Sequence, residues 1–155
     1  MTVHDVTTEA ADAFVTASRA LVGMAVRSID TAADVTVAQH RVLVLVAGRG
    51  PQTVGDIAVE LGVNPSNATR HCDRLDRLGL VSKQRSRSDG RIVEVSLTRE
   101  GRRVVDAVTD QRRAEVRAVL ARMDPAQVAA AIEALTAFST AAGEQDDEEW
   151  AAVPW

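Results

Sequence analysis

The chain has 155 residues, of which 46% are hydrophobic and 26% are charged, and its formal net charge is −4. This composition suits one globular domain, or a domain with an added helical layer, and it excludes an intrinsically disordered chain. Tyr is absent and only 3% of the residues are aromatic, so Ala, Val and Leu must fill the core.

The first residues lack the basic and apolar regions of a secretion signal, and no run approaches the roughly 18 apolar residues of a membrane span. The single cysteine, Cys72, cannot form an internal disulfide, which agrees with a reducing compartment. We therefore expect a cytoplasmic protein that has no membrane partner.

A long helix is predicted over residues 8–33, because apolar residues recur there at helical spacing in a stripe wide enough for burial on two sides. Thr36 and Gln39 then form a capping-box pattern, in which two side chains satisfy backbone N–H groups that lack helical partners. This pattern opens a second helix, which ends at the Gly-Arg-Gly-Pro break of residues 48–51.

Thr53 and Asp56 repeat the capping-box pattern and open a short third helix, which ends at Gly62. A fourth helix follows directly. Asn64 suits its N-cap because the side-chain oxygen can accept from a backbone N–H, and Pro65 suits the first helical position, where no donor is needed. Two short helices joined in this way are typical of a helix-turn-helix.

The fourth helix separates into two faces at about 100° per residue. Its apolar face holds Ala68, Cys72 and Leu75, and its polar face holds Ser66, Arg70, Asp73, Arg74 and Arg77. Asn67 and Thr69 flank the polar face, and His71 lies at the border of the apolar one. The helix is expected to end at Gly79, since glycine readily adopts the left-handed conformation found there.

A hairpin is predicted next. Residues 80–87 form a strand that runs into a basic loop, residues 88–90 (Ser-Asp-Gly) supply a turn, and residues 91–97 alternate as a returning strand. An arginine-bearing helix alone is usually only a solvated helix. The basic hairpin behind it favours a DNA-reading helix followed by a wing, which is the order of a winged helix-turn-helix.

Charge is unevenly distributed along the chain. Residues 64–103 contain ten basic and five acidic side chains, a local net charge of +5, whereas the remainder of the chain sums to −9. Phosphate binding requires such a concentration of positive charge on one surface.

Two further helices are predicted after the hairpin. Thr98 is expected to cap a helix that continues to about Met123, and Asp124 and Pro125 mark the start of another that lies antiparallel to it. From Gly143 onward the sequence is acidic and short, and it is not expected to build structure alone.

Residues 36–104 resemble the MarR family of bacterial transcriptional regulators. The resemblance is carried, in order, by TVAQHRVLVLV, TVGDIAVELGVNPSNATRHCDRLDRLGLV, the DGR of residues 89–91, and SLTREGRRV. It implies a mainly α fold with a small β-hairpin wing, and a ligand-responsive repressor that binds a pseudo-palindromic operator in double-stranded DNA as a homodimer. The expected organisation is an N-terminal dimerisation helix (1–35), a winged helix-turn-helix domain (36–98), C-terminal dimerisation helices (99–142) and an acidic tail (143–155).

Within this scheme we assign the DNA contacts by position. Base edges are expected to meet Ser66, Asn67, Thr69 and Arg70, and phosphates to meet Arg74, Lys83, Arg85 and Arg87. Arg91 is expected to enter the minor groove, with Asp89 orienting it by resemblance to the family.

The resemblance also implies a small aromatic or anionic effector, bound between the dimer-forming layer and the DNA-binding lobe. In this sequence the candidates are His40 and Arg41 as polar groups, with Phe14 and Leu43 as apolar walls. The alternative for His40 is that of a packing residue with satisfied hydrogen bonds.

Other chemistries are not supported. The histidines and Cys72 lack metal-ligand spacing. Ser66, His71 and Asp73 are the residue types of a catalytic triad, but they face different directions on one helix. No glycine-rich phosphate loop follows a strand. We therefore predict neither an enzyme nor a cofactor, and core packing rather than redox sensing for Cys72. The alternative function is a winged-helix module for protein interaction or ligand carriage, without sequence-specific DNA binding.

Overall fold

The computed structural model describes residues 3–86 and 92–143, which form six α-helices and three short β-strands. The helices are α1 (Val3–Ala32), α2 (Val37–Arg49), α3 (Val54–Leu61), α4 (Pro65–Arg77), α5 (Arg99–Leu120) and α6 (Pro125–Ala141). The strands are β1 (Gln52–Thr53), β2 (Val81–Arg85) and β3 (Val93–Leu97). The predicted fold class, mainly α with a small hairpin wing, is confirmed.

Helices α2 to α6 begin where the sequence predicts, whereas α1 is already helical at Val3 rather than from residue 8. Thr36 accepts a hydrogen bond from the Gln39 backbone while the Gln39 side chain accepts one from Thr36 N at 2.9 Å. Asn64 Oδ1 accepts from Asn67 N at 2.8 Å, with Pro65 at the first helical position. Because each cap satisfies a backbone donor that the helix leaves unpaired, each stabilises its helix by about 1 kcal/mol.

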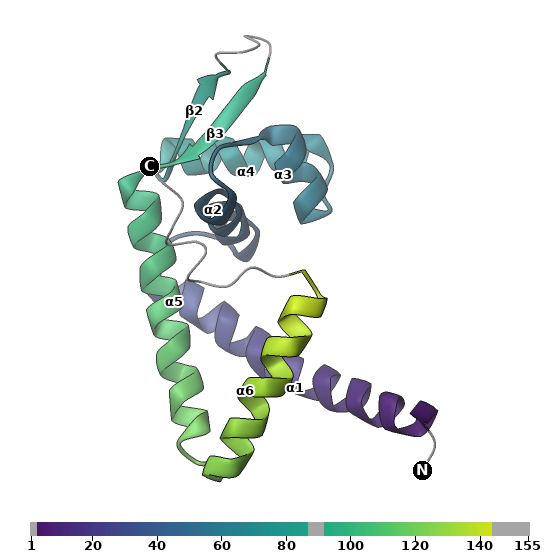
Figure 1. Cartoon of the computed structure of the whole chain (residues 1–155). Helices are drawn as coiled ribbons and strands as arrows, with labels where there is room; N and C mark the ends of the chain where they lie inside the picture. The colour runs from purple at the N-terminus through teal and green to yellow at the C-terminus, as the bar shows by residue number, and fades with distance from the viewer. Residues whose placement is uncertain (1–2, 87–91, 144–155) are drawn as a thin grey trace.

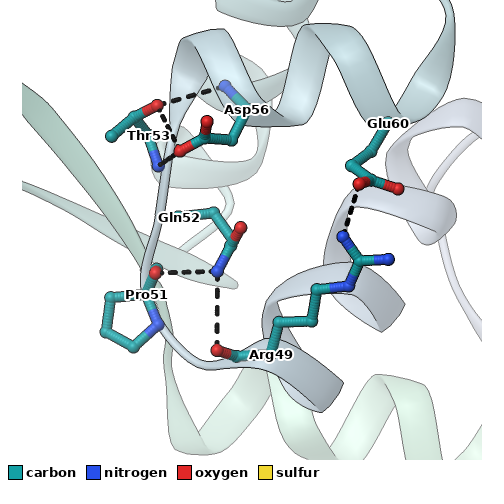
Figure 2. Close-up of polar contacts among 6 residues, drawn as sticks. All are labelled: Arg49, Pro51, Gln52, Thr53, Asp56 and Glu60. Carbon is teal, nitrogen blue, oxygen red and sulfur yellow. Dashed lines mark hydrogen bonds and ion pairs between the residues drawn. The ribbon is translucent and has the colours of Figure 1, made fainter. Parts of the chain in front are cut away.

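Figure 2 shows the corner between α2 and α3. Thr53 and Asp56 form the predicted capping box, and the Gln52 side chain donates to the carbonyl oxygen of Pro51 at 2.9 Å. An ion pair between Arg49 at the end of α2 and Glu60 near the end of α3 closes the corner. These contacts fix the angle at which α3 leaves α2.

The sheet has the order β1-β3-β2, and both pairings are antiparallel. The two predicted strands pair, with Val81 opposite Leu97 and Arg85 opposite Val93, while the predicted turn of residues 88–90 lies outside the described residues. Strand β1 was not predicted, because two residues are too few to show an alternating pattern. It adds a third strand to the sheet, opposite Glu94 and Val95 of β3.

The core lies between α2, α3, α4, the sheet and the first half of α5. Ala68, Cys72 and Leu75 are each 0% exposed, which confirms the predicted apolar face of α4. The other core residues are Val42, Leu43, Val46, Ala47, Ile57, Ala58, Leu80, Val81, Val95 and Val105. The polar face of α4 is therefore the one turned toward solvent.

The long helices form a second layer beside this lobe (Figure 1). Helix α1 packs on α5, where Arg27 and Glu115 form an ion pair at 2.8 Å, and Phe14 stacks on Phe138 of α6 with ring centroids 4.5 Å apart. Helix α6 has no buried residue. Large apolar side chains exposed on α1 and α6 are Val15, Leu21, Val22, Val26, Ile132, Leu135 and Phe138.

Helix α5 is fixed to the lobe at the turn between α4 and β2. Thr98 N donates to Leu80 O at 3.1 Å, and Thr98 Oγ1 donates to Gly79 O at 2.7 Å. Gly79 has φ +71°, the left-handed conformation predicted for this helix end. A Cβ on Gly101 would overlap the carbonyl oxygen of Leu80, so only glycine allows α5 to approach this closely.

We predict that Gly101→Ala destabilises the protein by about 2 kcal/mol or more, because backbone rather than a flexible side chain occupies the space. Thermal unfolding measures the effect. Gly55→Ala is the matched control, since its Cβ would meet nothing closer than Thr53 Oγ1 at 3.6 Å and alanine favours a helix. Equal melting temperatures for the two variants would show that the junction can relax.

Candidate nucleic-acid interface

The polar face of α4 carries the expected DNA-contacting residues. Ser66, Thr69, Arg70 and Arg74 are exposed, and Asn67 is half-buried. Thr69 Oγ1 donates to Pro65 O at 2.9 Å, which leaves the hydroxyl oxygen free to accept a further hydrogen bond near the start of the helix. In helix-turn-helix proteins, the first turns of the second helix contact base edges.

The wing lies beside α4, and Figure 1 shows it projecting from the lobe. Along β2, Val81, Lys83 and Arg85 share one face because side chains alternate, and they progress from buried through half-buried to exposed. Arg87, Asp89 and Arg91 lie outside the described residues, so their predicted roles stay predictions.

Lys83 has a partner that the sequence analysis did not assign. Its Nζ forms an ion pair with Asp73 Oδ1 of α4, and that hydrogen bond raises the pKa of Lys83. Helical periodicity puts Asp73 on the polar face of α4, and strand alternation puts Lys83 on one face of β2. Neither pattern predicts that a helix residue and a strand residue form a contact. The arginines of α4 remain on the exposed face, where Arg77 Nε donates to Asp73 O at 3.2 Å.

A second candidate site lies between α2 and α5. Two adjoining cavities, of about 340 and 450 Å³, are both lined by His40, Val44 and Arg112. Arg41 also lines the first, as do Arg49 and its ion-pair partner Glu60. Cationic side chains and apolar walls together suit an amphipathic anion.

His40 is 4% exposed, and neither its Nε2 nor Arg112 Nε has a hydrogen-bond partner among the described residues. Burial, and secondarily the charge of Arg112, lowers the pKa of His40 to about 4. The imidazole is therefore neutral at pH 7. His40 is as buried as a packing residue. Its Nε2, however, lacks the hydrogen-bond partner that a buried polar atom in such a residue normally has among the described residues.

The apolar walls differ from those expected. Leu43 is 0% exposed in the core and lines neither cavity, whereas Val44, four residues after His40, lines both. Phe14 is stacked on Phe138 and also lies outside both cavities. The sequence analysis missed Arg112, although its position seven residues after Val105 places it on the buried stripe of α5.

Cys72 is fully buried, and burial raises the pKa of its thiol to about 11. A protonated thiol is a poor nucleophile, which supports packing rather than oxidant sensing. The described residues contain no cluster of three or more metal-ligating side chains, and none of their helices is long and apolar enough to cross a bilayer.

The fold and the exposed basic helix beside a hairpin define a winged helix-turn-helix protein. A model of the MarR family matches residues 33–92. RV1404 from Mycobacterium tuberculosis is 37% identical, with a TM-score of 0.83, over 95% of this chain and 99% of that one. The chain belongs to the MarR family.

More distant structures share the fold. A MarR family protein from Bacillus stearothermophilus is 21% identical with a TM-score of 0.79, over 93% of this chain and 100% of that one. A MepR mutant from S. aureus, solved bound to an oligodeoxyribonucleotide, is 19% identical with a TM-score of 0.65, over 84% of this chain and 96% of that one. No curated protein sequence matches the chain significantly.

The buried neutral histidine predicts a pH dependence of stability. The pKa of His40 is lower in the folded protein than in the unfolded chain, so the unfolded chain binds more protons between about pH 4 and 6.5. Stability should therefore fall as the pH falls through this window, by up to about 3 kcal/mol from this group. His40→Leu should lose that part of the dependence in urea unfolding; identical pH profiles would contradict a buried neutral imidazole.

Proposed function

We propose that this protein is a cytoplasmic, homodimeric transcriptional repressor that binds a pseudo-palindromic operator and releases it on binding a small anionic or aromatic effector. The observation that carries the DNA-binding part is the exposed arginine face of α4 next to the basic wing. The family membership and the DNA-bound fold relative support it. Nothing in this account requires an enzymatic activity or a cofactor.

In this proposal α4 enters the major groove. Ser66, Asn67, Thr69 and Arg70 face base edges, since they occupy the first two turns, and Arg74 and Arg85 lie nearer the phosphates. The two copies of α4 in a twofold dimer would contact half-sites roughly 34 Å apart, one turn of the duplex.

The dimer interface would cover the exposed apolar side chains of α1 and α6. Ile132 is 63% and Phe138 52% exposed in the single chain, and α6 has no buried residue. Exposed apolar side chains are costly in water when they are numerous, and a twofold contact buries the same surface on both chains. The predicted division into dimerisation helices (1–35 and 99–142) and a DNA-binding domain (36–98) follows from this assignment.

The effector would bind in the cavities between α2 and α5. A carboxylate there could accept hydrogen bonds from Arg112 and from His40 in the tautomer protonated at Nε2, which would satisfy both unpartnered groups. Arg41 adds positive charge at the same cavity. A ligand that prefers one angle between α2 and α5 would shift the separation of the two α4 helices away from the half-site distance.

Gel shifts on the DNA upstream of its own gene, with a scrambled duplex for comparison, test the DNA-binding proposal. Arg70→Ala should weaken operator binding about 30-fold or more, because the dimer loses two contacts of about 1–3 kcal/mol each, and it should lower the preference over scrambled DNA. Arg74→Ala should weaken both complexes alike and reduce the salt slope by about 1.8, which is about 0.9 for each protomer.

Arg122→Ala is the matched control, because it removes the same charge from an exposed position after α5, at the opposite end of that helix from the lobe. It should leave both complexes unchanged. If the wild-type protein binds the two duplexes equally, a winged-helix module for protein interaction or ligand carriage becomes the better account.

Sedimentation tests the dimer. The wild type should sediment as a dimer at micromolar concentration, and Ile132→Glu should shift it toward monomer by placing a charge in the apolar contact. Val59→Glu is the control, since Val59 is 80% exposed but lies on α3. A monomeric wild type, or equal loss of dimer in both variants, would reject this interface.

A further inference from the structure

Asp73 is an acidic residue on the arginine-bearing face of α4, in the middle of the surface proposed to meet DNA. It lies between Arg70 and Arg77 along the helix, and its side chain is 45% exposed. A carboxylate in this position repels phosphates, so its presence on a DNA-reading helix calls for a physical reason. Its partner Lys83 supplies one.

Lys83 reaches Asp73 from a rigid base. Its Cα pairs with Val95 of the central strand, and Val81, two residues earlier on the same face of β2, is packed in the core. The Lys83 side chain is only 25% exposed. The ion pair therefore joins the middle of α4 to the wing where the wing leaves the core.

The pair also cancels two charges within the basic surface. The hydrogen bond to Asp73, together with the nearby carboxylate of Asp76, raises the pKa of Lys83 and keeps it protonated. Since its charge is matched by Asp73, Lys83 contributes little net attraction for a phosphate. This role of Lys83 as the partner of Asp73 differs from the phosphate contact that its position in the sequence suggested.

We propose that the Asp73–Lys83 pair is a positioning and specificity-determining device, which sets the wing against α4 and limits binding to non-operator DNA. The proposal rests on the proposed DNA-binding function. Specificity is a difference between two affinities, and it rises when attraction for any duplex is held down while the correct geometry is kept. The fixed wing favours DNA on which helix and wing engage together. The carboxylate of Asp73 cancels the charge that Lys83 would otherwise add to the sequence-independent attraction for phosphates.

The test measures Kd for the operator and for a scrambled duplex across a range of salt concentrations. Asp73→Asn should release Lys83, tighten binding to scrambled DNA several-fold, steepen the salt slope by up to about 1.8 for a dimer, and lower the operator preference. Lys83→Met should lower the operator preference, because the wing loses its link to α4. The salt slope of operator binding should not become shallower, because Lys83 is not a phosphate contact. The exchanged pair, Asp73→Lys with Lys83→Asp, should recover the preference to within about threefold of wild type.

Two results would overturn the proposal. A salt slope about 1.8 shallower in Lys83→Met, with the operator preference unchanged, would make Lys83 a phosphate ligand. An unchanged preference in Asp73→Asn would remove the specificity role.

Hydrogen exchange without DNA separates this proposal from the proposed function. The amides of β2 should exchange faster in each single variant, and the double variant Asp73→Asn with Lys83→Met should be no faster than the singles. Additive acceleration would reject the link between helix and wing. If wild type does not distinguish the duplexes, the proposed function and the specificity role fail together, while the exchange result still decides whether the pair positions the wing.

Discussion

The attachment of α5 to the turn between α4 and β2 is the constraint on which the architecture depends. Thr98 bonds to the carbonyl groups of Gly79 and Leu80, and Gly101 lies so close to Leu80 that a side chain would not fit. These contacts therefore hold the start of α5, the end of α4 and the start of the wing together. Since α5 also packs on α1, packed elements connect the helical layer directly to the proposed DNA-binding surface.

The chain separates its two proposed tasks by charge and by polarity. A protein with net charge −4 carries +5 within residues 64–103, and the large exposed apolar side chains gather chiefly on α1 and α6. The cavities that contain His40 and Arg112 lie between these regions, at the contact of α2 with α5. A ligand bound there would act on the angle between α5 and the lobe. This is how we interpret the buried His40 Nε2 and Arg112 Nε, which have no hydrogen-bond partner among the described residues.

Local rules were sufficient to predict most of the fold. The caps at Thr36, Thr53, Asn64 and Asp124 depend on side chains within three residues of the helix start, so they can be read from the sequence. Contacts between distant residues could not be read in this way. Strand β1 exists because β3 lies beside it, Lys83 meets Asp73 only after β2 folds against α4, and Leu43 turns into the core while Val44 lines the cavity.

The central claim is that two copies of α4 and its wing bind one face of a duplex, one helical turn apart. Hydroxyl-radical footprinting of the operator complex measures this directly. The account predicts two symmetric protected regions whose centres are separated by roughly 34 Å, with flanking protection from the wings. A single protected region, or uniform weak protection along the duplex, would contradict it.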